Sequence, residues 1–131
     1  MAIHLPALVV ALTVLLLAYV SYTVGRARGR YGIHSPATTG HPDFERVYRV
    51  QMNTNESALM FLPSLWLFGQ YLNPLIAGIL GIVWLIARFW YAQAYVSGRS
   101  RTVPFVIGGV IIVALLIGGV FGVVRAMILT S

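Results

Sequence analysis

Long apolar runs constrain the fold of this chain more strongly than any other feature of its sequence. A bilayer whose hydrocarbon core is about 30 Å thick requires about 20 mostly apolar residues in each spanning helix. Only 9% of the residues are charged, whereas soluble domains carry about 25%. The sequence therefore predicts an all-α fold, a four-helix transmembrane bundle in contact with membrane lipid, with residues 1–131 forming a single integral membrane domain. The expected helices cover residues of about 5–25, 43–72, 74–97 and 103–129.

Residues that start or stop helices mark the ends of these segments. Pro6 suits the first turn of the first helix, and Gly25 is expected to end that helix before a group of arginines. The chain begins without a positively charged region and no clear cleavage site follows, so we expect a retained helix rather than a signal peptide. Asp43 is the expected N-cap of the second helix, and Asn73 followed by Pro74 is the expected start of the third.

Positive charge is distributed unevenly between the connections, which predicts the orientation of the bundle. Loops rich in arginine and lysine favour the cytoplasmic side of a membrane. The connections after the first and third helices hold Arg26, Arg28, Arg30, Arg99 and Arg101, whereas the connection between the second and third helices has none. We therefore expect both termini on the side opposite the cytoplasm.

The charged and polar composition excludes several functional classes. The net charge of +6 comes from arginine alone, but these arginines lie beside or within apolar helices, so we expect no nucleic-acid partner. Cysteine is absent, which excludes disulfides and a thiol nucleophile from the protein itself. The histidines His4, His34 and His41 lack the spacing of metal ligands, so we expect no metal site.

Polar residues follow one face of the second helix, whose first half is polar and second half apolar. Arg46, Arg49, Asn53 and Glu56 are separated by three, four and three residues, a spacing that places them along one stripe. Charged groups in a membrane are costly and are by default functional.

The third helix repeats this pattern with Arg88, Tyr91 and Tyr95, and Arg101 follows its end. Two such stripes facing each other would bind a strongly anionic ligand, because arginine forms paired hydrogen bonds to carboxylate and phosphate. A structural role is an equal alternative, in which Glu56 pairs with Arg49 or Arg88 and only locks the helices together.

Small residues in the fourth helix indicate a close helix contact. Gly118 and Gly122 are four residues apart, a spacing that lets the backbone of another helix approach closely. Ordinary use of glycine in a membrane helix explains the same pattern equally well.

Three segments of the sequence carry a family resemblance: FERVYRVQMNTNE at residues 44–56, SPATTG at 35–40 and ARFWYAQAY at 87–95. The first is similar to the signature of the MAPEG family, the membrane-associated proteins of eicosanoid and glutathione metabolism, and the other two support the match. The resemblance is closest to the leukotriene synthase and microsomal glutathione transferase branches. The resemblance implies a homotrimer of four-helix subunits that binds glutathione near the cytoplasmic side and takes an apolar co-substrate from the lipid.

The resemblance also implies roles for individual residues. Arg28 and Gln51 would reach the ligand from the adjacent subunit, and Arg28 or Arg101 would stabilise the thiolate as catalytic residues. The expected glutathione-binding residues are Arg49, Gln51, Asn53, Glu56, Tyr91, Tyr95 and Arg88.

Two positions depart from the leukotriene synthases. Gly29 stands where those enzymes have a second consecutive arginine, and Ser57 stands where they have tyrosine. The expected activity is therefore a glutathione-dependent transferase or peroxidase acting on lipophilic electrophiles or hydroperoxides, with the identity of the electrophile open. A non-catalytic protein that binds or presents lipid, and a structural subunit without a small-molecule site, are the alternatives.

Overall fold

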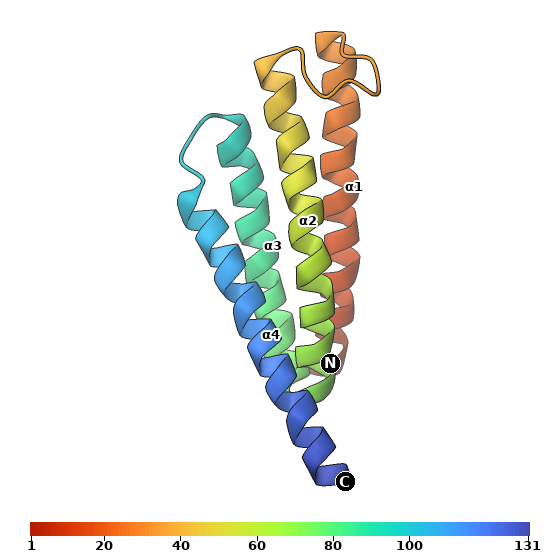
Figure 1. The fold of residues 1–131 in the computed structure, drawn as a ribbon, viewed down its shortest axis with the longest axis vertical. Coiled ribbons are helices and arrows are strands. Elements are labelled where there is room, and N and C mark those ends of the chain that lie inside the picture. Colours follow the sequence, from red (N-terminus) through yellow and green to blue (C-terminus); the bar gives the residue numbers. More distant parts are fainter.

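A computed structural model describes all 131 residues as a bundle of four long helices, α1 to α4 (Figure 1). After a short 3-10 helix at Ala2–His4, these helices cover Leu5–Tyr31, Pro42–Tyr71, Pro74–Val96 and Thr102–Thr130. Successive helices run in opposite directions, so both termini lie at one end of the bundle and the α1–α2 and α3–α4 connections lie at the other (Figure 1). The predicted all-α, four-helix architecture is confirmed.

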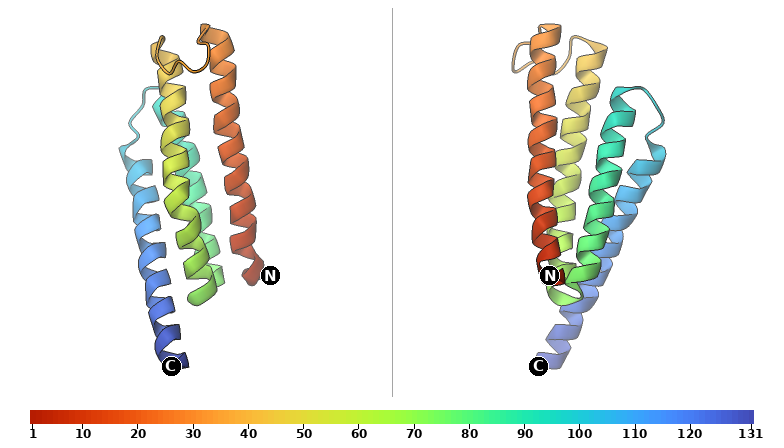
Figure 2. Two further views of the ribbon diagram at one scale, coloured as in Figure 1. Left: turned by 45° about the vertical axis from the view of Figure 1, so that its right-hand side comes forward. Right: turned by 180° about the vertical axis from the view of Figure 1, so that it is seen from behind.

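Three of the four helices, α1, α3 and α4, are long and apolar enough to cross a membrane. Helix α2 falls outside this group because its first half carries the polar stripe, although it runs beside the other helices along the bundle (Figure 2). Many large apolar side chains point outward, including Leu15, Ile86 and Ile117, each more than 60% exposed. An apolar exterior around a buried core is what a bilayer solvent requires, and the chain is an integral membrane protein.

Helix α1 continues six residues beyond the predicted end at residue 25 and carries its arginines on its last two turns. Gly25 does not stop it, because its φ is not positive and the arginines that follow are good helix formers. The helix ends at Gly32, whose φ of +66° is the left-handed conformation that glycine adopts at helix C-termini.

The two expected caps have different outcomes. The N-cap of α2 is His41 rather than Asp43, because the Asp43 N–H donates to Nδ1 of His41 at 3.1 Å and Pro42 occupies the first helical position. Asp43 lies instead in the first turn, where its charge complements the helix dipole. At the start of α3, Asn73 caps as predicted and accepts from the Ile76 N–H at 2.9 Å.

Aromatic and small residues hold the bundle together. The Phe61 ring of α2 stacks on the Trp84 ring of α3 with centroids 3.8 Å apart, and neither side chain is exposed. On α4, a Cβ at Gly118 would overlap the Phe68 ring, and one at Gly122 would lie 2.4 Å from the carbonyl oxygen of Tyr71. The close approach expected at these glycines is therefore made by α2 of the same chain.

Candidate functional site

A cavity of about 230 Å³ lies between α2, α3 and the start of α4, toward the end of the bundle that carries the α3–α4 connection. We call it the polar cleft. It brings together six of the nine predicted site residues, and Met52 completes its wall. Its lining residues are Arg49, Met52, Asn53, Glu56, Tyr91, Tyr95 and Arg101.

The α2 wall of the polar cleft follows from helical spacing. Positions 49, 53 and 56 share one face, while Val50, Thr54 and Ala58 are buried on another. The polar side chains are thereby directed away from the apolar core without interrupting the helix.

The α3 and α4 wall is built from two tyrosine rings, tilted at 56° to each other, and one cation. The Tyr91 and Tyr95 rings lie 5.8 Å apart, one helical turn from each other. Arg101, the N-cap residue of α4, places its guanidinium carbon 4.1 Å from the centre of the Tyr95 ring. This distance is within the range of a cation–π interaction, which holds the positive charge at the edge of the cleft.

Arg88 lies behind the polar cleft rather than on its surface. It is 2% exposed, and its Nη2 donates to Oδ1 of Asn53 at 2.9 Å and to Oγ1 of Thr54 at 3.0 Å. Arginine is only a donor, so Asn53 must turn its carbonyl oxygen toward Arg88, which leaves its NH₂ group for another partner. Sequence reasoning identified Asn53 and Arg88 but missed Thr54, whose only signal was a hydroxyl on an otherwise buried helix face.

The cleft carries free charges of both signs. The one ion pair in the chain joins Arg46 to Asp43, at 3.5 Å, with both side chains about half exposed. Glu56 therefore pairs with neither Arg49 nor Arg88, and the interpretation that it locks the helices by such a pair is wrong. Arg46, although part of the predicted stripe, does not line the cleft.

Arg28 and Gln51 lie apart from the polar cleft in the single chain. Nη1 of Arg28 donates to the carbonyl oxygen of Ala37 at 2.7 Å, and its guanidinium lies 5.1 Å from the centre of the Phe44 ring. These contacts tie the α1–α2 connection to both helices. Gln51 is half-buried on α2 and does not line the cleft.

Sequence comparison agrees with this arrangement of helices and polar residues. The model of the MAPEG family matches residues 6–121. The chain belongs to the MAPEG family. Leukotriene C4 synthase of Cavia porcellus is 43% identical over 103 residues, which cover 78% of this chain and 69% of the synthase. Microsomal glutathione S-transferase 2 of Homo sapiens is 34% identical over 112 residues, covering 85% of this chain and 76% of the transferase.

A Synechocystis relative is also similar to this MAPEG chain. It carries the name Uncharacterized protein sll1147 and is 47% identical over 119 residues, covering 90% of this chain and 87% of its own length. The MAPEG match at residues 6–121 includes parts of all four helices and every residue of the polar cleft.

Proposed function

We propose that this MAPEG protein is a membrane-bound glutathione transferase, with glutathione peroxidase activity as a related reaction, acting on lipophilic electrophiles or hydroperoxides. The observation that carries the proposal is the set of unpaired Arg49, Glu56 and Arg101 in one cleft. Relatives named leukotriene C4 synthase and microsomal glutathione S-transferase 2 support it.

The chemistry of the cleft complements that of glutathione, an anionic tripeptide with two carboxylates, one ammonium group and a thiol. Arg49 and the two phenols of Tyr91 and Tyr95 would bind the carboxylates. Glu56 would accept the ammonium group, and the NH₂ group of Asn53 would donate to a peptide carbonyl. In this assignment Arg88 is a positioning residue, which acts on the ligand through Asn53.

Arg101 is the proposed catalytic residue. A thiol has an ordinary pKa of about 8.5, and only its thiolate is an effective nucleophile. A guanidinium beside the sulfur favours the anion and lowers that pKa. In conjugation a sulfur–carbon bond forms and the leaving group departs with its electron pair. With a hydroperoxide the sulfur attacks the terminal oxygen, the O–O bond breaks, and the alkoxide takes a proton and leaves as the alcohol. A second glutathione then attacks the resulting sulfenic acid, which releases water and gives glutathione disulfide.

We further propose that a homotrimer completes the site. Arg28 and Gln51 lie away from the polar cleft of their own chain, so they would act on glutathione only in a neighbouring subunit. Arg28 has hydrogen-bonding capacity for this role, because only its Nη1 donates within the chain. The cleft would then face the cytoplasm, with both termini on the opposite side, since the arginine-rich connections lie at its end of the bundle.

Conjugation of a chromogenic aryl halide and reduction of a fatty-acid hydroperoxide test the proposal. We expect the parent to turn over at least one of these substrates, and we expect Arg101→Gln to lose most of that activity. Arg125→Gln is the matched control, since it removes the same charge from the far end of α4 and should retain activity. Full activity in Arg101→Gln would refute the assigned role.

A non-catalytic protein that binds or presents lipid is the second candidate, and Gly29 is the observation that favours it. This helical position is exposed and carries no side chain where the leukotriene synthases have an arginine. A lipid carrier has no need of the unpaired charges in the polar cleft. Binding of a fluorescent fatty acid without turnover of either substrate would favour the carrier.

A further inference from the structure

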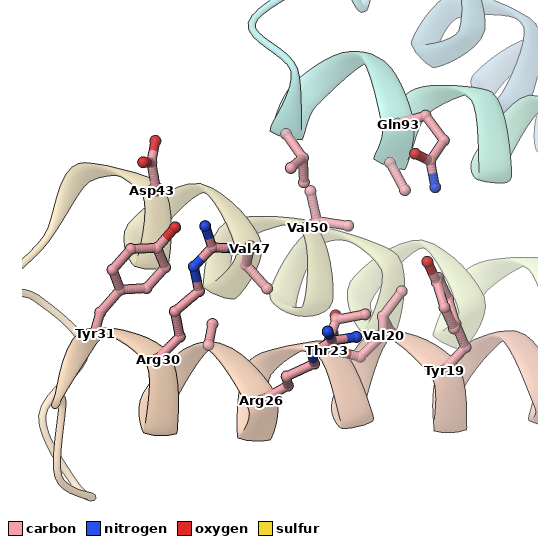
Figure 3. Close-up of a pocket in the computed structure, with 13 residues that line it drawn as sticks. Tyr19, Val20, Thr23, Arg26, Arg30, Tyr31, Asp43, Val47, Val50 and Gln93 are labelled. Carbon is pink, nitrogen blue, oxygen red and sulfur yellow. Dashed lines mark hydrogen bonds between the residues drawn. The ribbon is translucent and has the colours of Figure 1, made fainter.

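A second and larger cavity lies between α1, α2 and α3 at the same end of the bundle (Figure 3). Its volume is about 530 Å³, and it shares no lining residue with the polar cleft. Arg26 and Arg30 of α1 both line it, one helical turn apart, and Figure 3 shows Arg30 extending toward α2 beside Tyr31. The glutathione site proposed above uses neither arginine.

The charges of this cavity are unbalanced. Neither Arg26 nor Arg30 forms an ion pair or a side-chain hydrogen bond within the chain. The one carboxylate on the wall belongs to Asp43, which already pairs with Arg46. The other polar groups that line the wall are neutral: Tyr19, Thr23, Tyr31 and Gln93. Two free guanidinium groups in a cavity with neutral donors form a site for an anion.

An apolar cavity adjoins this cationic one in the groove between α1 and α3. Its volume is about 460 Å³, and Tyr19 lines both cavities. All seven of its lining residues are hydrophobic: Leu12, Leu15, Leu16, Tyr19, Leu85, Ile86 and Phe89. At 1.5 Å per residue, Leu12 lies about 21 Å along α1 from Arg26. The groove therefore has a cationic end and a long apolar end, along a helix apolar enough to cross the membrane.

We infer that this α1–α3 groove binds one anionic membrane lipid, with its headgroup phosphate between Arg26 and Arg30 and an acyl chain against the apolar residues. Arginine binds phosphate with two parallel hydrogen bonds, and the arginines lie where α1 leaves its apolar stretch. A soluble anion would use only the cationic end. The position of an apolar cavity directly beside the cationic one therefore favours a lipid over free phosphate.

Native mass spectrometry of the detergent-purified protein tests this inference, with dioleoyl phosphatidylglycerol and dioleoyl phosphatidylcholine as probes. We expect preferential retention of phosphatidylglycerol. The double variant Arg26→Gln/Arg30→Gln should lower that retention on the order of tenfold, since each arginine near an anionic lipid contributes measurably to binding. Arg125→Gln removes a similar charge outside the groove and should leave retention unchanged. Equal retention of phosphatidylglycerol by the double variant and the parent would overturn the inference.

Ile86→Trp tests the apolar end separately. Ile86 is 63% exposed in the groove, so a larger side chain fills the acyl site without entering the core. We expect this variant to retain less phosphatidylglycerol than the parent, although Arg26 and Arg30 are both unchanged. Titration with inorganic phosphate is the second arm: phosphate binding together with undiminished lipid retention in Ile86→Trp would identify a free-anion site and refute the lipid. Glutathione binding in both variants should match the parent, which separates this inference from the proposed function.

Discussion

The guanidinium carbon of Arg101 lies 4.1 Å from the centre of the Tyr95 ring, across the connection between α3 and α4. Tyr95 belongs to the last turn of α3, and Arg101 is the N-cap residue of α4. The contact holds a long cationic side chain at one edge of the polar cleft. A charge held in a defined place can favour a thiolate more effectively than one that moves freely.

The first prediction concerns the pH dependence of turnover. The proposed role of Arg101 is to favour the thiolate, so its loss should raise the pKa of bound glutathione, and activity should then require higher pH. We expect Arg101→Gln to move the alkaline rise of kcat/KM upward by about one pH unit or more. Arg101→Lys keeps the charge and should shift the profile less. The same pH profile in Arg101→Gln and the parent would contradict the thiolate role.

The second prediction concerns Arg88 and its two acceptors. Arg88→Met removes both hydrogen bonds and leaves the Asn53 and Thr54 oxygens unpaired, so the free energy of unfolding should fall by about 1 to 3 kcal/mol. Thermal unfolding in detergent measures this loss. A positioning role also predicts that the KM for glutathione rises more than kcat falls. Lower stability with an unchanged KM for glutathione would show that Arg88 has a structural role only.

How much of the fold could be predicted from the sequence depends on what determines each feature. Features set within one helical turn were predictable, and features set by contacts between helices were not. Asn73 and Pro74 act within one turn, so the start of α3 was predictable. The end of α1 was not, because Gly25 weakens the helix without ending it when the arginines that follow still favour the helix. Gly32 ends the helix through its left-handed backbone, which sequence spacing does not reveal.

The same distinction applies to the polar cleft. Spacing along α2 and α3 predicted which residues share a face, and the structure brings Arg49, Glu56 and Tyr95 to one cavity. It did not predict that Arg88 lies behind the cleft that Tyr91 and Tyr95 line. That position depends on Thr54 of the neighbouring helix, which supplies an acceptor inside the bundle. The pattern of a single helix cannot show which of its polar residues will find a hydrogen-bond partner on the neighbouring helix.

The third prediction compares two glycines of α4. Gly122→Ala places a Cβ 2.4 Å from the Tyr71 carbonyl oxygen, so the α2 backbone must move. Overpacking of this kind costs about 1 to 3 kcal/mol. Gly109→Ala is the matched control, because a Cβ there meets nothing within 4 Å. Similar unfolding temperatures for both variants would show that the α2–α4 contact is looser than the structure indicates.

The fourth prediction concerns Gly29 and Gly32 at the end of α1. Gly29 is helical and a Cβ would meet nothing within 4 Å, so Gly29→Ala should stabilise the protein by about 0.5 to 1 kcal/mol. Gly32→Ala has equally open surroundings but a φ of +66°, and it should destabilise. Thermal unfolding of the two variants separates the effect of backbone conformation from that of packing, because both sites have open surroundings. Stabilisation by both substitutions would contradict the assigned helix end.

Isothermal titration of the purified protein with glutathione tests the central claim most directly. The account predicts saturable binding by the parent and by Arg125→Gln, with affinity at least about tenfold weaker in both Arg49→Ala and Glu56→Ala, because each removes a charge-assisted hydrogen bond. Binding of glutathione by Arg49→Ala and Glu56→Ala with the affinity of the parent, or no binding by the parent at all, would show that the polar cleft is not a glutathione site.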